Sequence, residues 1–206
     1  MEKTHVFTAV AAEAPYHHIL YRMGYKSGLT EMDEKQKAKI DSQISLGRSL
    51  CSVKAAYLRC AVKSATAGLV LLENGIEFKS NLLSEILHGC PEAVLMASTA
   101  GQGVVDARDK EMADGNASLS LIIYATASET ADAGLDWMQN FLNKLLSKEG
   151  LELTRRYSPG YGDLDLSAQK PVFEALELHR IGMSINERFI LTPEKSVLAV
   201  AGVRTR

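Results

Sequence analysis

The chain has 206 residues, of which 46% are hydrophobic and 23% are charged. Its 23 Lys and Arg residues nearly balance its 25 Asp and Glu residues, so the net charge is only −2. This composition excludes a disordered chain and gives no electrostatic reason for nucleic-acid binding. We find no apolar run long enough for a membrane helix and no secretory signal. We therefore expect one cytoplasmic domain over residues 1–206.

The first part of the chain predicts an arm, a helix and two strands. Proline and glycine residues interrupt residues 1–30, which we expect to wrap around the domain as an N-terminal arm. Residues 31–50 are polar with isoleucines at near-helical spacing, which indicates a surface helix. Apolar runs predict strands over residues 53–62 and 65–72, and Glu73-Asn74-Gly75 has the composition of a turn.

The middle of the chain predicts a short helix, a buried strand and two longer helices. Ser80 is a typical N-cap for a short helix through His88, and Gly89 follows as the residue that terminates it. Residues 93–97 are a short apolar run typical of a buried strand. The following glycine-rich loop leads into a helix that ends near residue 115, and residues 116–148 predict another.

The last of these helices carries two distinct stripes. Large apolar side chains recur at helical spacing, at Leu135, Met138, Leu142 and Leu145. A second stripe consists of small residues, at Ala127, Ala131 and Gly134. We expect another backbone element to pack closely against this second stripe.

The C-terminal third mixes strands and helices without regular alternation. A strand is expected over residues 151–157, a Pro/Gly loop over 158–165 and a helix over 169–178. Residues 186–191 and 196–203 predict a hairpin through Thr192-Pro193-Glu194-Lys195. This order indicates an α+β fold with an antiparallel sheet and helices on one face.

Most familiar catalytic and metal-binding patterns are missing. Cys51, Cys60 and Cys90 lack metal-ligand spacing, so we interpret them as small buried side chains. The adjacent His17 and His18 have no acidic partner nearby in the sequence. The sequence contains no P-loop, no G-x-S-x-G and no H-E-x-x-H. We therefore predict neither a resident metal nor catalytic residues of these classes.

The segment from Arg155 to Asp163, RRYSPGYGD, has a different character. Its arginines could bind a carboxylate through two parallel hydrogen bonds. Its glycines allow a ligand close to the backbone, and its tyrosines supply flat walls. The pattern indicates a site for a small anion or zwitterion, although an ordinary surface loop with arginines has the same composition.

This segment also resembles part of a known family, the activation domain of cobalamin-dependent methionine synthase. Residues 156–161, RYSPGY, are similar to the R-x-x-P-G-Y loop of that family. Residues 181–197, IGMSINERFILTPEKSV, are similar to its following strand and P-x-x-S-V turn. Looser matches lie upstream, at residues 20–25, 97–101 and 127–133. The resemblance covers nearly the whole chain and is specific over residues 156–197.

The resemblance implies a single C-shaped α+β domain that binds S-adenosylmethionine. In the family, this domain supports the reductive remethylation of inactive cob(II)alamin, with the electron coming from flavodoxin or a similar ferredoxin-like donor. The present sequence has no D-x-H-x-x-G cobalamin signature, no zinc cysteines for homocysteine and no folate barrel. The resemblance therefore implies a reactivation subunit that acts in trans on a cobalamin-dependent methionine synthase or a related corrinoid methyltransferase, in methionine biosynthesis.

Several residues match family positions that contact S-adenosylmethionine. Arg156 matches the arginine that holds the methionine moiety, and Tyr161 matches the tyrosine beside it. Ser158 and Gly160 match positions that contact the ligand through their backbone. Asp132 lies where the family has a glutamate facing the cationic end of the ligand. Glu187 and Arg155 are residues that could support these contacts without touching the ligand.

Other features point away from S-adenosylmethionine binding. The sequence has no match for an N-terminal aspartate that contacts the adenosyl group in the family. It also ends at Arg206, without a further segment that carries a ligand-contacting tyrosine. These differences leave open a non-catalytic adaptor that docks on a corrinoid protein, or a small-molecule sensor that uses the same pocket.

Overall fold

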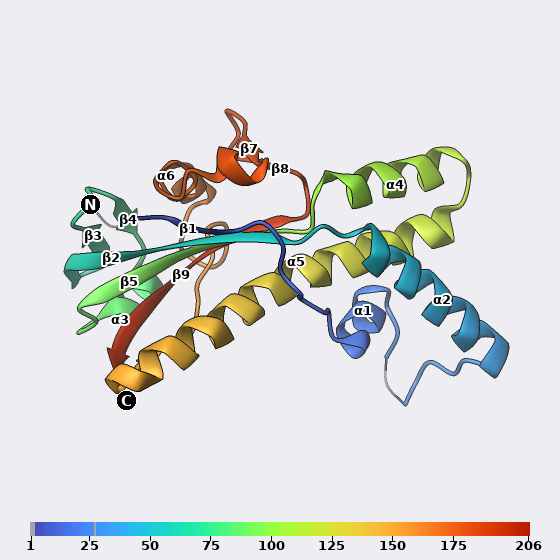
Figure 1. Cartoon of the computed structure of the whole chain (residues 1–206), viewed down its shortest axis with the longest axis horizontal. Coiled ribbons are helices and arrows are strands. Elements are labelled where there is room, and N and C mark those ends of the chain that lie inside the picture. Colours follow the sequence, from blue (N-terminus) through green and yellow to red (C-terminus); the bar gives the residue numbers. More distant parts are fainter. Residues whose placement is uncertain (1–2, 27) are drawn as a thin grey trace.

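The computed structural model describes residues 3–26 and 28–206, so Met1, Glu2 and Ser27 of the expected arm lie outside the described residues (Figure 1). The strands are β1 His5–Phe7, β2 Lys54–Thr66, β3 Leu69–Leu72, β4 Glu77–Lys79, β5 Glu92–Thr99, β6 Leu151–Leu153, β7 Ser184–Ile185, β8 Leu191–Thr192 and β9 Ser196–Thr205. The α-helices are α1 Tyr16–Arg22, α2 Glu34–Leu50, α3 Asn81–Leu87, α4 Gln102–Ala113, α5 Ala117–Leu146 and α6 Gln169–Ala175. Short 3-10 helices cover Ser147–Glu149, Leu166–Ala168 and Leu178–Ile181.

The main sheet is antiparallel, with the strand order β4-β3-β2-β5-β9-β6, and β1 pairs with the first part of β2. The centre of the sheet is formed by β2, β5 and β9, whose registers run over eight residue pairs on each side of β5. The predicted α+β class with an antiparallel sheet is confirmed.

Alternate residues of β2 point to opposite faces of the sheet, as the two-residue period of a strand requires. Ala55 and Tyr57 pack with Leu135 and Met138 of α5. On the other face, Ala56 and Leu58 belong to the cluster that includes side chains of α3 and α6. Figure 1 shows α5 crossing one side of the sheet and α6 lying on the other. Helices therefore cover both faces of the sheet, because all three central strands are apolar on both sides. The expectation that the helices lie on one face is wrong.

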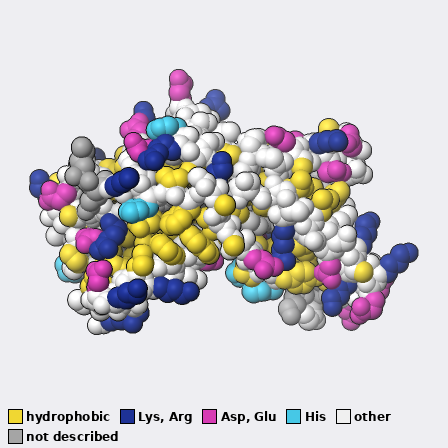
Figure 2. Space-filling view, in the orientation of Figure 1, with side chains coloured by type: hydrophobic (Ala, Val, Ile, Leu, Met, Phe, Trp, Pro, Cys, Tyr) yellow, Lys and Arg dark blue, Asp and Glu magenta, His cyan; other side chains and the backbone are white. Residues whose placement is uncertain are grey.

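The N-terminal arm is attached to the sheet and to α5. In β1, Phe7 contacts Trp137 and Phe141 of α5, with ring centroids 5.1 and 5.4 Å apart. Figure 2 shows hydrophobic side chains gathered between β1 and α5 on this face. Further along, Ile19 of α1 packs with Ile44 of α2 and with α5. The arm is therefore part of the packed structure.

The helix predicted over residues 31–50 is confirmed as α2. Asp33 accepts a hydrogen bond from the Gln36 backbone, and the Gln36 side chain accepts one from the Asp33 backbone, which completes a capping box. Ile40 and Ile44 are buried, but Leu46 is 44% exposed because it lies on the outer side of the helix.

One predicted strand boundary and one predicted hairpin are wrong. The strand expected to end at residue 62 continues to Thr66, and the chain turns at Ala67 and Gly68, both with positive φ, as a two-residue hairpin requires. Near the C-terminus, β7 pairs with β8, while β9 pairs with β5 and β6. The apolar run of β9 is suited to the centre of a sheet, and this burial outweighs the local hairpin signal.

The stripe of small residues on α5 is confirmed as a close-packing face. Ala127 and Ala131 are almost fully buried in a cluster with Val104 of α4. Gly134 faces Ser98 of β5 so closely that an added Cβ would overlap the serine hydroxyl. Glycine at this position lets α5 lie directly against the sheet.

Candidate functional site

The loop that follows Arg156 is held in shape by Tyr157. The Tyr157 backbone exchanges two hydrogen bonds of 2.8 Å with Val200 of β9. Its hydroxyl donates to the Tyr161 carbonyl oxygen at 2.9 Å and accepts from the Asp163 backbone at 3.2 Å. The chain therefore closes around the tyrosine ring, and this fixes the direction in which residues 158–161 leave the sheet.

Asp163 joins this loop to the start of α3. Its carboxylate accepts hydrogen bonds from Ser80 Oγ at 2.5 Å and from the Asn81 backbone at 2.7 Å. The hydrogen bond from Ser80, followed by those from the backbone, holds the pKa of the Asp163 carboxyl below its ordinary value. Ser80 is the predicted N-cap of α3, since its hydroxyl also accepts from the Leu83 backbone. The loop is thus anchored at both ends.

Beside the loop lies a cavity of about 430 Å³, a volume within the usual range for small-molecule sites. Four of the predicted site residues line it together: Asp132, Arg156, Ser158 and Tyr161. The remaining lining residues are Tyr157, Pro159, Gln169, Ser196, Val197 and Leu198. The cavity therefore combines α5, the loop after β6, the start of α6 and the first residues of β9.

Arg156 extends toward α5. Its Nη1 donates to Asp136 Oδ1 at 2.5 Å and to Gln139 Oε1 at 3.3 Å. The arginine side chain is 25% exposed, and that of Asp136 is 53% exposed. Asp136 and Gln139 are absent from the predicted site. The sequence does contain a signal for them, because they follow Asp132 at i+4 and i+7 on the same helical face.

Helix α5 contributes Asp132 to the cavity wall, and two further carboxylates of this helix, Glu129 and Asp136, lie near it. Burial raises the pKa of the Asp132 carboxyl, and the nearby Arg156 guanidinium opposes this shift. One turn earlier, Glu129 is 9% exposed and accepts a 2.5 Å hydrogen bond from Arg22 of α1. Three carboxylates and two guanidinium groups thus share this surface, which favours a ligand that carries both a carboxylate and positive charge.

The opposite wall is built from hydrogen-bonded polar groups. Gln169 is 9% exposed, and its Nε2 donates to the Phe189 carbonyl oxygen at 2.9 Å. Ser196 Oγ lies 2.8 Å from Thr99 Oγ1 and donates to the Pro193 carbonyl oxygen at 2.6 Å. At the mouth, Tyr161 is 70% exposed, so its ring is accessible to a ligand.

Three predicted site residues do not line this cavity. The Gly160 backbone N–H donates to the Leu164 carbonyl oxygen at 2.8 Å, and its φ of 86° serves the turn. Arg155 is exposed, and its side chain does not belong to the cavity wall. Glu187 is exposed in the turn between β7 and β8. The sequence pattern could not separate turn-forming positions from lining positions.

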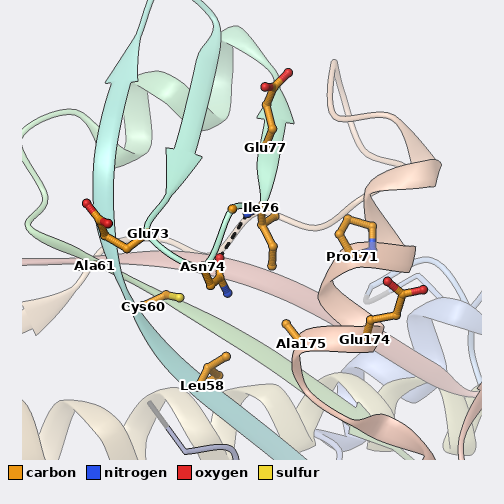
Figure 3. Close-up of a pocket in the computed structure, with 11 residues that line it drawn as sticks. Leu58, Cys60, Ala61, Glu73, Asn74, Ile76, Glu77, Pro171, Glu174 and Ala175 are labelled. Carbon is orange, nitrogen blue, oxygen red and sulfur yellow. Dashed lines mark hydrogen bonds between the residues drawn. The ribbon is translucent and has the colours of Figure 1, made fainter. Parts of the chain in front are cut away.

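A larger cavity of about 710 Å³ lies elsewhere, between β2, the turn before β4 and α6 (Figure 3). Leu58 and Cys60 of β2 lie at one side of it, and Pro171 and Ala175 of α6 lie at another. None of the predicted site residues lines this cavity. Size alone therefore does not identify the functional site. The smaller cavity combines an arginine with a carboxylate, whereas the charged side chains of the larger one are all glutamates, Glu73, Glu77 and Glu174.

Within residues 3–26 and 28–206, no group of three or more His, Cys, Asp and Glu side chains is placed to hold a metal ion. Cys60 and Cys90 are buried and Cys51 is partly buried, in keeping with their interpretation as packing residues. No helix in this described part of the chain is long and apolar enough to span a membrane.

Comparison with known proteins gives a match in structure and none in sequence. No family model matches the sequence, and no curated protein matches it. The structure, however, is similar to the crystal structure of the MetH reactivation domain bound to AdoHcy, with a TM-score of 0.74 and 12% sequence identity. The match covers 97% of this chain and 78% of that chain. The chain has the reactivation-domain fold. The resemblance seen in residues 156–197 is thus confirmed at the level of the fold.

Proposed function

We propose that residues 1–206 form one activation-type domain that binds S-adenosylmethionine in the 430 Å³ cavity. In the cytoplasm, the domain would act in trans as a reactivation subunit for a cobalamin-dependent methionine synthase or a related corrinoid methyltransferase. The observation that carries the proposal is the convergence of Asp132, Arg156, Ser158 and Tyr161 on one cavity. The likeness to a reactivation domain bound to AdoHcy supports this class of ligand.

The charges of the cavity fit the charges of the ligand. S-adenosylmethionine carries a carboxylate, an ammonium and a sulfonium group. Arg156 would bind the carboxylate, because guanidinium donates two parallel hydrogen bonds to that group. Asp132 would face the cationic groups, which compensate the cost of burying its charge. Tyr161 would cover the ligand at the mouth of the cavity.

The work of this chain in the reaction is to bind and align the methyl donor. A corrinoid partner would hold the cobalamin that accepts the methyl group, and a flavodoxin- or ferredoxin-like protein would supply the electron. The cavity is open on the side of Tyr161, so the ligand could be reached by a partner. Reductive remethylation would then restore the partner to its active form.

Calorimetric titration with S-adenosylmethionine tests the proposal. Arg156→Ala should weaken binding by about 2–3 kcal/mol, roughly 30- to 150-fold, because a partly buried carboxylate loses its partner. Arg155→Ala is the matched control, since this neighbouring arginine is exposed outside the cavity wall. Equal effects of the two substitutions would contradict the assigned clamp.

The ion pair between Arg156 and Asp136 favours a second candidate, an adaptor that has lost ligand binding, because the guanidinium already has a counter-ion. The two functions differ in one titration. An adaptor would show no heat of binding with S-adenosylmethionine, either alone or with the corrinoid protein present. A site completed by the partner would bind only in the second experiment.

A further inference from the structure

The guanidinium of Arg156 is held by one of its nitrogens. Both hydrogen bonds from this group leave through Nη1, to Asp136 Oδ1 and to Gln139 Oε1. In the part of the chain that the structure describes, Nε and Nη2 have no hydrogen-bond partner. These two nitrogens form one edge of the guanidinium, with parallel N–H groups spaced to bind a carboxylate.

Gln139 is itself oriented by the backbone after β6. Its Nε2 donates to the Thr154 carbonyl oxygen at 3.3 Å, which turns Oε1 toward Arg156. Thr154 is in turn joined to Gly202 of β9 by two hydrogen bonds. The Thr154 backbone N–H donates to the Gly202 carbonyl oxygen at 2.9 Å, and the Gly202 N–H donates to Thr154 Oγ1 at 2.8 Å. One turn further along α5, Asn143 Oδ1 accepts from the Leu153 backbone at 2.8 Å. A chain of hydrogen bonds therefore leads from the sheet to the arginine.

We infer that Gln139, with Asp136, is a positioning residue that holds the Nε–Nη2 edge of Arg156 ready for the ligand carboxylate. This inference rests on the proposed function and assigns the carboxylate to a particular edge of the guanidinium. Gln139 acts through Arg156 and does not line the cavity. The hydrogen bonds that Asp136 and Gln139 accept from Nη1 restrict the rotation of the Arg156 side chain. Arg156 therefore loses less conformational entropy when the ligand binds.

A pair of ligands tests the inference: S-adenosylmethionine and its decarboxylated form, which keeps the sulfonium, amine and adenosyl groups. The wild-type protein should prefer the carboxylated ligand. Gln139→Met, which removes the amide but keeps an unbranched side chain, should reduce this preference by about tenfold. Asn140→Met is the matched control, because this neighbouring side chain on α5 is exposed. The control should leave the preference unchanged.

Each outcome has one meaning. Weaker binding of the carboxylated ligand alone supports the positioning role. Equal weakening of both ligands, or no change in the preference, overturns it. A wild-type protein that binds neither ligand, both alone and with the corrinoid protein present, refutes the proposed function and the positioning role together. If Gln139→Met does not fold, Gln139→Asn tests the same geometry, since its shorter amide cannot span Thr154 and Arg156, and it too should reduce the preference.

Discussion

The close approach between α5 and the sheet at Gly134 allows a quantitative test of the packing. A Cβ added at Gly134 would overlap Ser98 Oγ, and would lie 3.0 Å from Ser98 Cβ and 3.3 Å from Val53 Cγ1. Rotation of the serine hydroxyl can relieve only the first of these contacts. The backbone of α5 or of β5 must therefore move, in a region where Ser98 is fully buried.

Two opposing contributions set the effect of Gly134→Ala on stability. Replacing a helical glycine by alanine stabilises by about 1 kcal/mol, whereas overpacking a rigid core costs about 1–3 kcal/mol. Because a central strand and a long helix form this contact, we expect the overpacking cost to dominate. The free energy of unfolding should fall by up to about 2 kcal/mol.

Urea denaturation measures this change, with Gly103→Ala as the matched control. Gly103 is also helical, but an added Cβ there would meet only the Leu50 carbonyl oxygen at 3.9 Å, so the control should be neutral or stabilising. In a Ser98→Ala background, the cost of Gly134→Ala should shrink but persist, because the 3.0 Å contact with Cβ remains. Stabilisation by Gly134→Ala would refute the reasoning.

Three further predictions concern charged groups. Burial raises the pKa of Asp132, so its ionised form destabilises the ligand-free fold at neutral pH. Asp132→Asn should therefore raise the urea midpoint at pH 7 by more than at pH 4. It should also weaken binding of S-adenosylmethionine more than that of S-adenosylhomocysteine, which keeps the carboxylate and the ammonium but lacks the sulfonium charge. Equal losses for both ligands would argue against its role. The pKa of Asp163 is lowered, so its stabilisation is present above the unfolded pKa of about 3.9 and is lost as pH falls through the lower folded value. Asp163→Asn should flatten the acid side of a plot of stability against pH, and parallel profiles would contradict this. Arg22→Met should destabilise the fold by about 1–2 kcal/mol, because it leaves the Glu129 carboxylate without its partner. The loss should be smaller than for a fully buried pair, since the Arg22 side chain is 39% exposed. In thermal unfolding, Glu129→Gln in the same background should recover part of the loss.

Local patterns were sufficient to predict those elements that depend on local interactions. The capping signals at Ser80 and the apolar spacing of residues 116–148 correctly indicated α3 and α5. The loop over residues 156–161, predicted as a ligand site from its residue types, contributes to the wall of a cavity. In each case, the interactions that decide the structure join residues close in sequence, or residues of recognisable chemical type.

The partners of β9 and the covering of both sheet faces depended on the tertiary structure, because strand pairing is chosen by burial across distant segments. The same holds within the site. The sequence by itself determined that Arg156 and Asp132 were candidates for a charged ligand. Only the folded chain decided that Asp136 and Gln139 hold one end of the guanidinium, since α5 and the loop after β6 meet there through contacts between residues 17 and 20 positions apart.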